Sequence, residues 1–248
     1  MRSRSGSVTT FDVSAAGTDT YQGTFPQCIN PSGTIAGEFV DANNVYHGFV
    51  RSPSNAITTF DPRGSVETLI SGSDGLNPLG AISGYYMDSG GVYHGFTRVP
   101  NGSITTFDAG TGAGAGQGTT TGGINLYGMT TGVYANASNV YDGYVRAPDG
   151  MITTFSVSAA ITGAYQGTAP ESLNLKGAVT GQYIDAGNVN HGFVRAADGS
   201  ITTFDAPAPD AGTGAYQGTV PFANNLAGQV TGYTIDDNGV FHGFVRTP

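Results

Sequence analysis

Short stretches in which apolar and polar residues alternate run along the whole chain, and turn-forming residues separate them. Alternation with a period of two is typical of β-strands that bury one face. The first complete set of such stretches predicts four strands, at residues 27–30, 34–41, 45–51 and 57–60. In the second of these strands, Ile35, Gly37 and Phe39 share one face. No stretch has the apolar period of an amphipathic helix and no apolar run approaches about 18 residues, so the pattern predicts an all-β protein without a membrane-spanning helix.

The same pattern recurs five times, and three separate motifs mark each copy. The tetrad Val/Ile-Thr-Thr-Phe ends at five phenylalanines, which are Phe11, Phe60, Phe107, Phe155 and Phe204. The motif Val-x-His-Gly-Phe/Tyr-x-Arg ends at five arginines, which are Arg51, Arg98, Arg146, Arg195 and Arg246. Its histidine is present in four copies, as His47, His94, His191 and His242, and Asp142 stands in the remaining one. The motif Asn-x-x-Gly begins at Asn30, Asn77, Asn125, Asn174 and Asn225. The tetrads lie 47 to 49 residues apart, so the chain is a fivefold repeat.

Four antiparallel strands in about 48 residues is the size of one β-propeller blade. The sequence therefore predicts a single all-β domain, residues 1–248, that forms a five-bladed β-propeller. The expected blades are residues 26–61, 73–108, 121–156, 170–205, and 221–248 together with 7–12. Because the chain begins at the fourth strand of a repeat and stops after the third, residues 8–12 are predicted to pair with the C-terminal blade and close the ring. A β-solenoid or a two-sheet assembly is the alternative.

Composition and charge narrow the partners that this chain can have. Nine basic and eighteen acidic residues give a net charge of −9, which argues against nucleic acid and anionic lipid. The single cysteine, Cys28, cannot form an internal disulfide, and no zinc-binding spacing is present. Richness in Gly, Thr, Ser and Asn with one lysine is typical of extracellular bacterial proteins. Residues 5–10 are not apolar enough for an export signal, so we expect an extracellular or cell-surface protein with no signal peptide in this chain.

The repeat motifs resemble the HAF family of extracellular bacterial repeats, which is named for a His-Ala-Phe triplet. The resemblance rests on the Asn-x-x-Gly motif, on Gly-x-Tyr/Phe-x-Asp elements such as residues 37–41, and on His47-Gly48-Phe49 and its copies, where glycine replaces alanine. It covers the whole chain and implies no particular activity. In blade number and repeat length the chain is also similar to the tachylectin-type five-bladed lectins, which bind sugars at sites repeated around the ring. That second resemblance is architectural, and it implies sugar binding only by analogy.

The longer polar loops are predicted to gather on one face of the ring, where function concentrates in such folds. The loop between repeats carries Tyr-Gln-Gly-Thr in three copies and Gly-Gln-Gly-Thr in a fourth, while the second copy has Leu69-Ile70-Ser71 in that place. The turn between the second and third strands begins with Asp or Asn. An aromatic ring, an amide and a carboxylate suit a sugar, because the ring packs on C–H groups and the polar groups bind hydroxyls. The candidate ligand-binding residues are Tyr21, Gln22, Asp41, Gln117, Asn136, Tyr165, Gln166, Asp185, Tyr216, Gln217 and Asp236. They predict three or four sites. The alternative is that these side chains only pack and satisfy loop backbone.

The recurring histidines and arginines of the third strand are expected to be structural. Equivalent positions around a propeller diverge, so the histidines cannot share one metal ion. We expect them and the arginines to join neighbouring strands or blades through hydrogen bonds, and we expect no metal or cofactor. Turns such as residues 41–44 are compatible with Ca²⁺ without specifying it.

The sequence therefore predicts a monomeric, multivalent binding module whose ligand is a carbohydrate or glycoconjugate. Two alternatives stay open. One is a structural or protein-interaction scaffold without a small-molecule site, and the other is a lyase or hydrolase that uses one degenerate blade. Within one repeat, His47 and Asp41 could act as a base and the group that orients it. Near-identical copies argue against an enzyme, and no GxSxG, HExxH or nucleotide-binding motif is present.

Overall fold

The predicted all-β class is confirmed by the computed structural model, which describes residues 6, 8–160 and 162–248. Within this part of the chain there are nineteen strands and no helix. It follows that none of the described residues belongs to a helix long and apolar enough to cross a membrane.

The strands form antiparallel units that follow the order of the chain. The first unit consists of β1 (Gly23–Ile29), β2 (Ile35–Val40), β3 (Tyr46–Arg51) and β4 (Ile57–Phe60). The second consists of β5 (Ser65–Ile70), β6 (Ile82–Asp88), β7 (Tyr93–Arg98) and β8 (Ile104–Phe107). The third consists of β9 (Gly118–Ile124), β10 (Thr130–Ala135), β11 (Tyr141–Arg146) and β12 (Ile152–Phe155). The fourth consists of β13 (Thr168–Leu173), β14 (Val179–Ile184), β15 (Asn190–Arg195) and β16 (Ile201–Phe204). The last has three strands, β17 (Gly218–Asn224), β18 (Val230–Ile235) and β19 (Phe241–Arg246).

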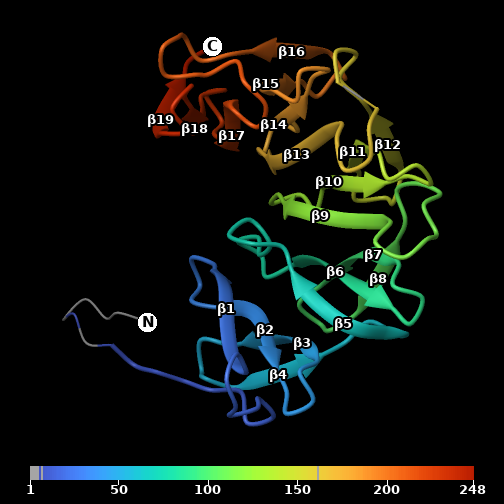
Figure 1. Cartoon of the computed structure of the whole chain (residues 1–248). Coiled ribbons are helices and arrows are strands. Elements are labelled where there is room, and N and C mark those ends of the chain that lie inside the picture. The colour runs from blue at the N-terminus through green and yellow to red at the C-terminus, as the bar shows by residue number, and fades with distance from the viewer. Residues whose placement is uncertain (1–5, 7, 161) are drawn as a thin grey trace.

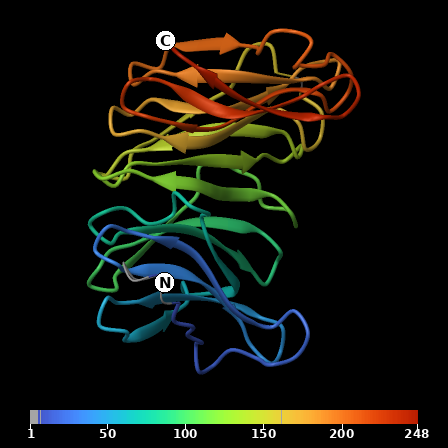
Figure 2. The same ribbon diagram turned by 90° about the vertical axis from the view of Figure 1, so that its left-hand side faces the viewer.

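The units follow one another along an arc, with the first unit at one end and the last at the other (Figure 1). The first strands β1, β9, β13 and β17 lie towards its concave side. The view turned by 90° shows the sheets stacked on one another along the chain (Figure 2). From the second unit onward, neighbouring units share a single parallel bridge, which is Tyr93 with Gly118, Tyr141 with Gly167 and Asn190 with Gly218. The first and second units are joined instead by side chains, such as Phe60 against Phe96. The arc is thus built by repeating one junction between units.

Each junction is packed by the phenylalanine of a Thr-Thr-Phe tetrad. Phe107 covers Gly95 of its own unit so closely that a Cβ at Gly95 would lie 2.7 Å from the ring. The same ring meets Tyr144 of the next unit edge-on, with centroids 5.9 Å apart. Arg146 of that next unit lies 4.8 Å over the Phe107 ring. The arginines therefore join neighbouring units, as expected, but the contact is a cation–π stack rather than a hydrogen bond.

The Asn-x-x-Gly turns link the units near the axis of the arc. Asn30, Asn77, Asn125 and Asn174 are buried, whereas Asn225 of the last unit is exposed. In each turn the asparagine Oδ1 accepts hydrogen bonds from the backbone of that turn. The side-chain amide of Asn77 then donates to the carbonyl of Asn125 at 3.0 Å, and that of Asn125 donates to the carbonyl of Asn174 at 3.2 Å. Asn30 and Asn174 make the equivalent bonds to Asn77 and Asn225. A chain of side-chain amides thus runs from the first unit to the last.

The strand pairing that would close a ring is not among those of the described residues. The outer edge of β19 has no partner there, and residues 8–12 form no strand beyond a bridge at Val8. Phe11 instead packs on Phe49 of the first unit, with centroids 6.1 Å apart. Residue 7, also assigned to this strand from the sequence, lies outside the described residues. Ring closure therefore stays a prediction.

The second unit contains extra residues, and the sequence spacing predicted them at the wrong place, before its first strand instead of after it. Its first strand begins at Ser65, earlier than the expected residue 73. The buried Thr68 occupies the position of Thr119 and Thr168 in other units, as its pairing with β6 shows. The extra residues therefore follow the strand, as a loop at residues 71–75. This loop reaches across the inner strands, since the carbonyl of Asp74 accepts from Ile124 N at 2.9 Å.

Candidate functional site

The three tyrosines of the Tyr-Gln-Gly-Thr loops are exposed and adopt an unusual backbone conformation. Tyr21, Tyr165 and Tyr216 have φ of 66°, 62° and 65°, the left-handed region that a bulky residue rarely adopts. Their exposed fractions are 90%, 58% and 69%. The third unit has Gly116 at this position, with φ of 79°. The backbone here suits glycine, and three copies carry an exposed aromatic ring instead.

The glutamine of each loop is bonded within the protein, and in the first, third and fourth units its amide binds the turn of the same unit. The Oε1 of Gln217 accepts from the backbone N of Gly214 at 2.7 Å. The Nε2 of Gln22 donates to Asn44 Oδ1 at 3.0 Å, and that of Gln117 donates to Asn139 Oδ1 at 3.1 Å. Gln166 makes the equivalent bond to Asn188. These amides are engaged within the protein, so they position the loop and do not point freely at a ligand.

Tyr165 and Tyr216 lie over the turn of the preceding unit rather than over the turn of their own unit. The backbone N of Tyr165 donates to the carbonyl of Asn139 at 2.7 Å, and that of Tyr216 donates to Asn188 at 2.7 Å. The ring of Tyr165 also meets Tyr141 of the preceding unit, with centroids 6.2 Å apart. The structure therefore brings these two tyrosines to the turn of the repeat before them, a choice that the sequence left open. Tyr21 has no preceding unit in the arc.

The acidic residue that begins each of these turns supports the turn itself. Asp41 Oδ1 accepts from the backbone N of Asn43 at 2.8 Å and of Val45 at 2.9 Å. The N–H of Val45 is the main reason why the pKa of Asp41 lies below its usual range. The same holds for three other turn aspartates, which are Asp88, Asp185 and Asp236. Asn136 accepts the equivalent bonds. One oxygen of each side chain is thus engaged by the backbone.

The other carboxylate oxygen faces the histidine of the repeat. His94 has Asp88 Oδ2 at 3.4 Å from its Nε2 and Asp108 Oδ1 at 2.7 Å from its Nδ1. It also stacks on Tyr86, with centroids 4.9 Å apart. His47 and His191 have the same surroundings. The histidine thus joins a turn to the end of the fourth strand of one unit. The second acid was missed from the sequence, although it directly follows the Thr-Thr-Phe tetrad. In the part of the chain described, no group of three or more His, Cys, Asp or Glu is arranged to hold a metal ion.

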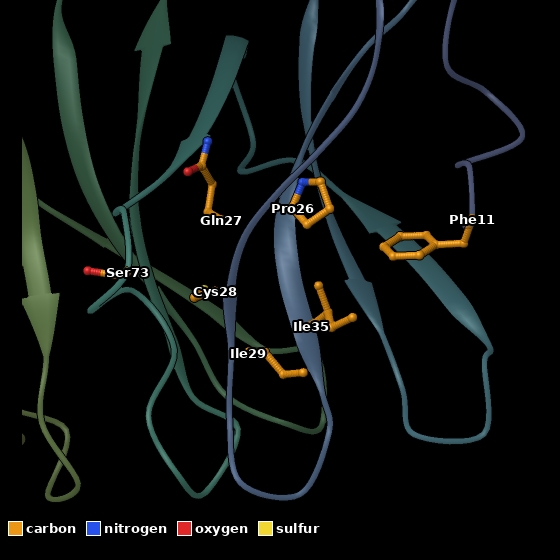
Figure 3. A pocket seen from close by; sticks show the side chains of 7 residues that line it. All are labelled: Phe11, Pro26, Gln27, Cys28, Ile29, Ile35 and Ser73. Carbon is orange, nitrogen blue, oxygen red and sulfur yellow. The ribbon is translucent and has the colours of Figure 1, made fainter. Parts of the chain in front are cut away.

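The larger cavities lie away from the tyrosines. One of about 440 Å³ opens beside β1 and is lined by Cys28 and Ile29 of that strand and by Phe11 of the N-terminal segment, which lies at its far side (Figure 3). Another of about 390 Å³ lies among the inner strands and is lined by Asp74 and Glu171, among others. Burial raises the pKa of the Glu171 carboxyl to about 7. A ligand of the tyrosines would accordingly bind on an open surface.

Comparison with known proteins identifies no family. No family model matches the chain, and no curated protein matches it. Among solved structures, the chain is similar to a mutant of the Aleuria aurantia lectin in complex with Fucα1-6GlcNAc, with a TM-score of 0.49. The two sequences are 14% identical, and the match covers 90% of this chain and 74% of the lectin. Support for a function therefore comes from the repeated geometry of the chain itself.

Proposed function

We propose that the protein is a multivalent carbohydrate-binding module, extracellular or at the cell surface, whose sites are built on Tyr21, Tyr165 and Tyr216. The observation that carries this proposal is the exposed ring on a left-handed backbone. Such a conformation costs on the order of 1 kcal/mol for a residue with a Cβ. Burial does not offset that cost, because the rings are 58% to 90% exposed. Contact of the ring with a ligand would explain why three copies keep a tyrosine at a position where glycine would be less strained.

The surroundings of each ring suit a sugar. An exposed tyrosine offers a flat apolar face to sugar C–H groups and a hydroxyl to sugar hydroxyls. Beside Tyr216 lies the turn that starts at Asp185, and beside Tyr165 lies the one that starts at Asn136, through the backbone bonds to Asn188 and Asn139. These turns add polar groups at a fixed distance. The third unit keeps Gln117 but has no ring, so we propose three sites whose weak affinities combine on a multivalent ligand.

We also propose that the units are the blades of a closed five-bladed propeller whose last blade is completed by residues 8–12. The repetition of one junction along the arc supports this arrangement, since a fifth junction of the same kind would join the two ends. On its motifs we propose that the chain is a HAF-type repeat protein.

The direct test is a glycan array probed with the labelled protein and with variants in which the tyrosines are replaced by glycine. Tyr165→Gly and Tyr216→Gly remove the ring and relieve the backbone, so binding should fall while the unfolding midpoint stays equal or rises. Tyr127→Ser is the matched control, because Tyr127 is 63% exposed in an Asn-x-x-Gly turn on the other face. We expect that control to bind like the wild type.

An interaction scaffold without a sugar site is the second candidate, favoured by one observation. The glutamine amides and the turn aspartates are engaged within the protein. A folded wild-type protein that binds no glycan would contradict the carbohydrate proposal and support this scaffold. Loss of stability without loss of binding in a Gln22, Gln166 and Gln217 triple alanine variant would confirm that these residues only hold the loops.

A further inference from the structure

The two ends of the arc expose groups that are covered at every junction inside it. We infer that residues 8–24 and the last unit of the same chain bind each other through contacts that can be assigned one by one, and that this junction completes the site of Tyr21. The inference deepens the proposed closed propeller and rests on it. The segment 8–12 is the occupant that it assigns to the open edge of β19.

The first assigned contact lies at the outer edge. In the first unit Gly48 pairs with Phe60, and Arg51 pairs with Ile57. The same motif spacing places Phe11 opposite Gly243. A Cβ at Gly243 would meet nothing within 4 Å, whereas the equivalent position at Gly95 is covered by a phenylalanine ring at 2.7 Å. Phe11 already makes the contacts that a tetrad phenylalanine makes with the next unit, because it packs on Phe49 and lies under Arg51.

The second contact concerns the histidine of the last unit. His242 has one carboxylate, Asp236 Oδ2 at 3.4 Å from its Nε2, whereas His94 lies between two. The second acid in the other units directly follows the tetrad phenylalanine, as Asp108 follows Phe107. Asp12 follows Phe11 in the same way and is exposed. Closure would therefore bring Asp12 to the Nδ1 of His242.

The third contact lies where β1 begins. At internal junctions a Cβ on the glycine of Gln-Gly-Thr would strike the carbonyl of the preceding unit, as at Gly118 with Tyr93 at 2.1 Å. Gly23 carries the same motif and has nothing within 4 Å. Its missing neighbour is the residue equivalent to Tyr93, which is Phe241, and that side chain is 63% exposed. Gly23 and Phe241 are thus both available for this contact, but they do not touch in the open arc.

The fourth contact would complete the chain of asparagines. Asn174 donates to the carbonyl of Asn225 at 2.9 Å. Asn225 has no further unit to bond and donates to Gln229 Oε1 at 2.8 Å within its own turn. In a closed ring the next carbonyl is that of Asn30. Both end units also expose apolar side chains, which are Ile29 in the first unit and Phe241 and Val245 in the last.

The same chain is the favoured partner because it carries both surfaces on one continuous arc. The ends of that arc both lie on its open side (Figure 1). Covalent connection gives the ends a high effective concentration for each other, so closure within one chain is favoured over pairing with a second copy. By analogy with Tyr165 on Asn139, closure places Tyr21 over Gly239 and beside the turn that begins at Asp236. Tyr21 would then have the same surroundings as the other two rings.

A cysteine pair tests the inference directly. In a Cys28→Ser background, Thr9→Cys with Val245→Cys occupies the register that Thr58 and Val50 share in the first unit. Mild oxidation should give an intramolecular disulfide, seen as a monomer that is 2 Da lighter and more mobile on a denaturing gel. Thr58→Cys with Val50→Cys is the positive control, and Thr9→Cys with Asn101→Cys is the mismatched control. Disulfide-linked dimers would assign the edge of β19 to a second copy, and free thiols in a folded protein would mean that the ends do not meet. Either result overturns the inference.

Glycine substitutions give an independent readout. Gly95→Ala should lower the unfolding midpoint, because Phe107 lies where the methyl group must go. If Phe11 covers Gly243, then Gly243→Ala should lower the unfolding midpoint by a similar amount. In a Phe11→Ala background, adding Gly243→Ala should then leave the midpoint unchanged. A silent Gly243→Ala beside a destabilising Gly95→Ala would contradict closure. Neither experiment uses a sugar, and sites at Tyr165 and Tyr216 do not need the closed ring. Failure of closure and failure of carbohydrate binding are therefore distinguishable.

Discussion

The side-chain amide of Asn77 donates a hydrogen bond to the backbone carbonyl of Asn125 across 3.0 Å, and so joins the turn of one unit to the turn of the next. Asn77 is 2% exposed, and its Oδ1 accepts from Leu79 N at 3.0 Å and Ala81 N at 2.9 Å. One asparagine thus shapes its own turn and fixes its neighbour.

Replacing this asparagine should be costly. Asn77→Ala leaves the N–H groups of Leu79 and Ala81 without their acceptor and removes the link to the Asn125 carbonyl, which keeps only its bond from Gly128 N. We therefore expect a loss of about 2–4 kcal/mol in the free energy of unfolding. Chemical denaturation measures it. Asn101→Ala is the matched control, because Asn101 is exposed and accepts one bond, from Ser103 N. Equal effects of the two variants would contradict a linking role for Asn77.

Stacking of arginine on phenylalanine should matter more than the arginine charge alone. Arg146 is 8% exposed and lies 4.8 Å over Phe107. Arg146→Lys keeps the charge but loses the planar stack, so we expect destabilisation by about 1–2 kcal/mol, measured by thermal and denaturant unfolding. The exposed Arg63 offers the control Arg63→Lys, which should be neutral. A neutral Arg146→Lys would show that the charge suffices.

Glu171 should make the fold less stable as the pH rises. Burial raises its carboxyl pKa from the ordinary 4.5 to about 7. The folded state therefore favours the protonated form, so the contribution of this group is complete below about pH 4.5 and is lost as the pH rises through 7. Glu171→Gln should remove that dependence and stabilise the protein at pH 8 by on the order of 2 kcal/mol. Unfolding midpoints between pH 4 and 8 test this. Asp198→Asn, an exposed carboxyl, should leave this pH range unchanged.

The turn aspartates should produce the opposite dependence at acid pH. Backbone N–H groups hold the pKa of Asp41, Asp88, Asp185 and Asp236 below the ordinary 3.8. Their stabilising contribution is present above about pH 4 and is lost as the pH falls through the lowered pKa values. A variant with Asn at all four positions keeps the accepting oxygen, as Asn136 does naturally. Its unfolding midpoint should fall less steeply between pH 4 and 2, and an unchanged slope would contradict the assignment.

Local patterns predicted the elements of this fold well. Alternation predicted the strand at residues 57–60, which is β4, and turn chemistry predicted the turn that Asp41 begins. The candidate site was predicted less completely. The sequence placed Tyr165 and the turns on one face without saying which turn it meets, and a backbone bond places it on Asn139 of the preceding repeat. Which unit a loop contacts depends on packing between units, and no local pattern encodes that choice.

Local sequence patterns were enough to predict the fivefold repeat, the all-β class and the face on which the polar loops gather, because strand alternation and turn geometry depend on residues that are close along the chain. Tertiary structure alone decided where the extra residues of the second unit go, which acid lies beside Nδ1 of His94, and how Asn77 reaches Asn125. These contacts join residues that are distant in sequence, and the junction between units that forms them is a property of packed surfaces. The exposed ends of the arc are likewise visible only in the tertiary structure, which shows that Gly243 lacks the phenylalanine ring that covers Gly95.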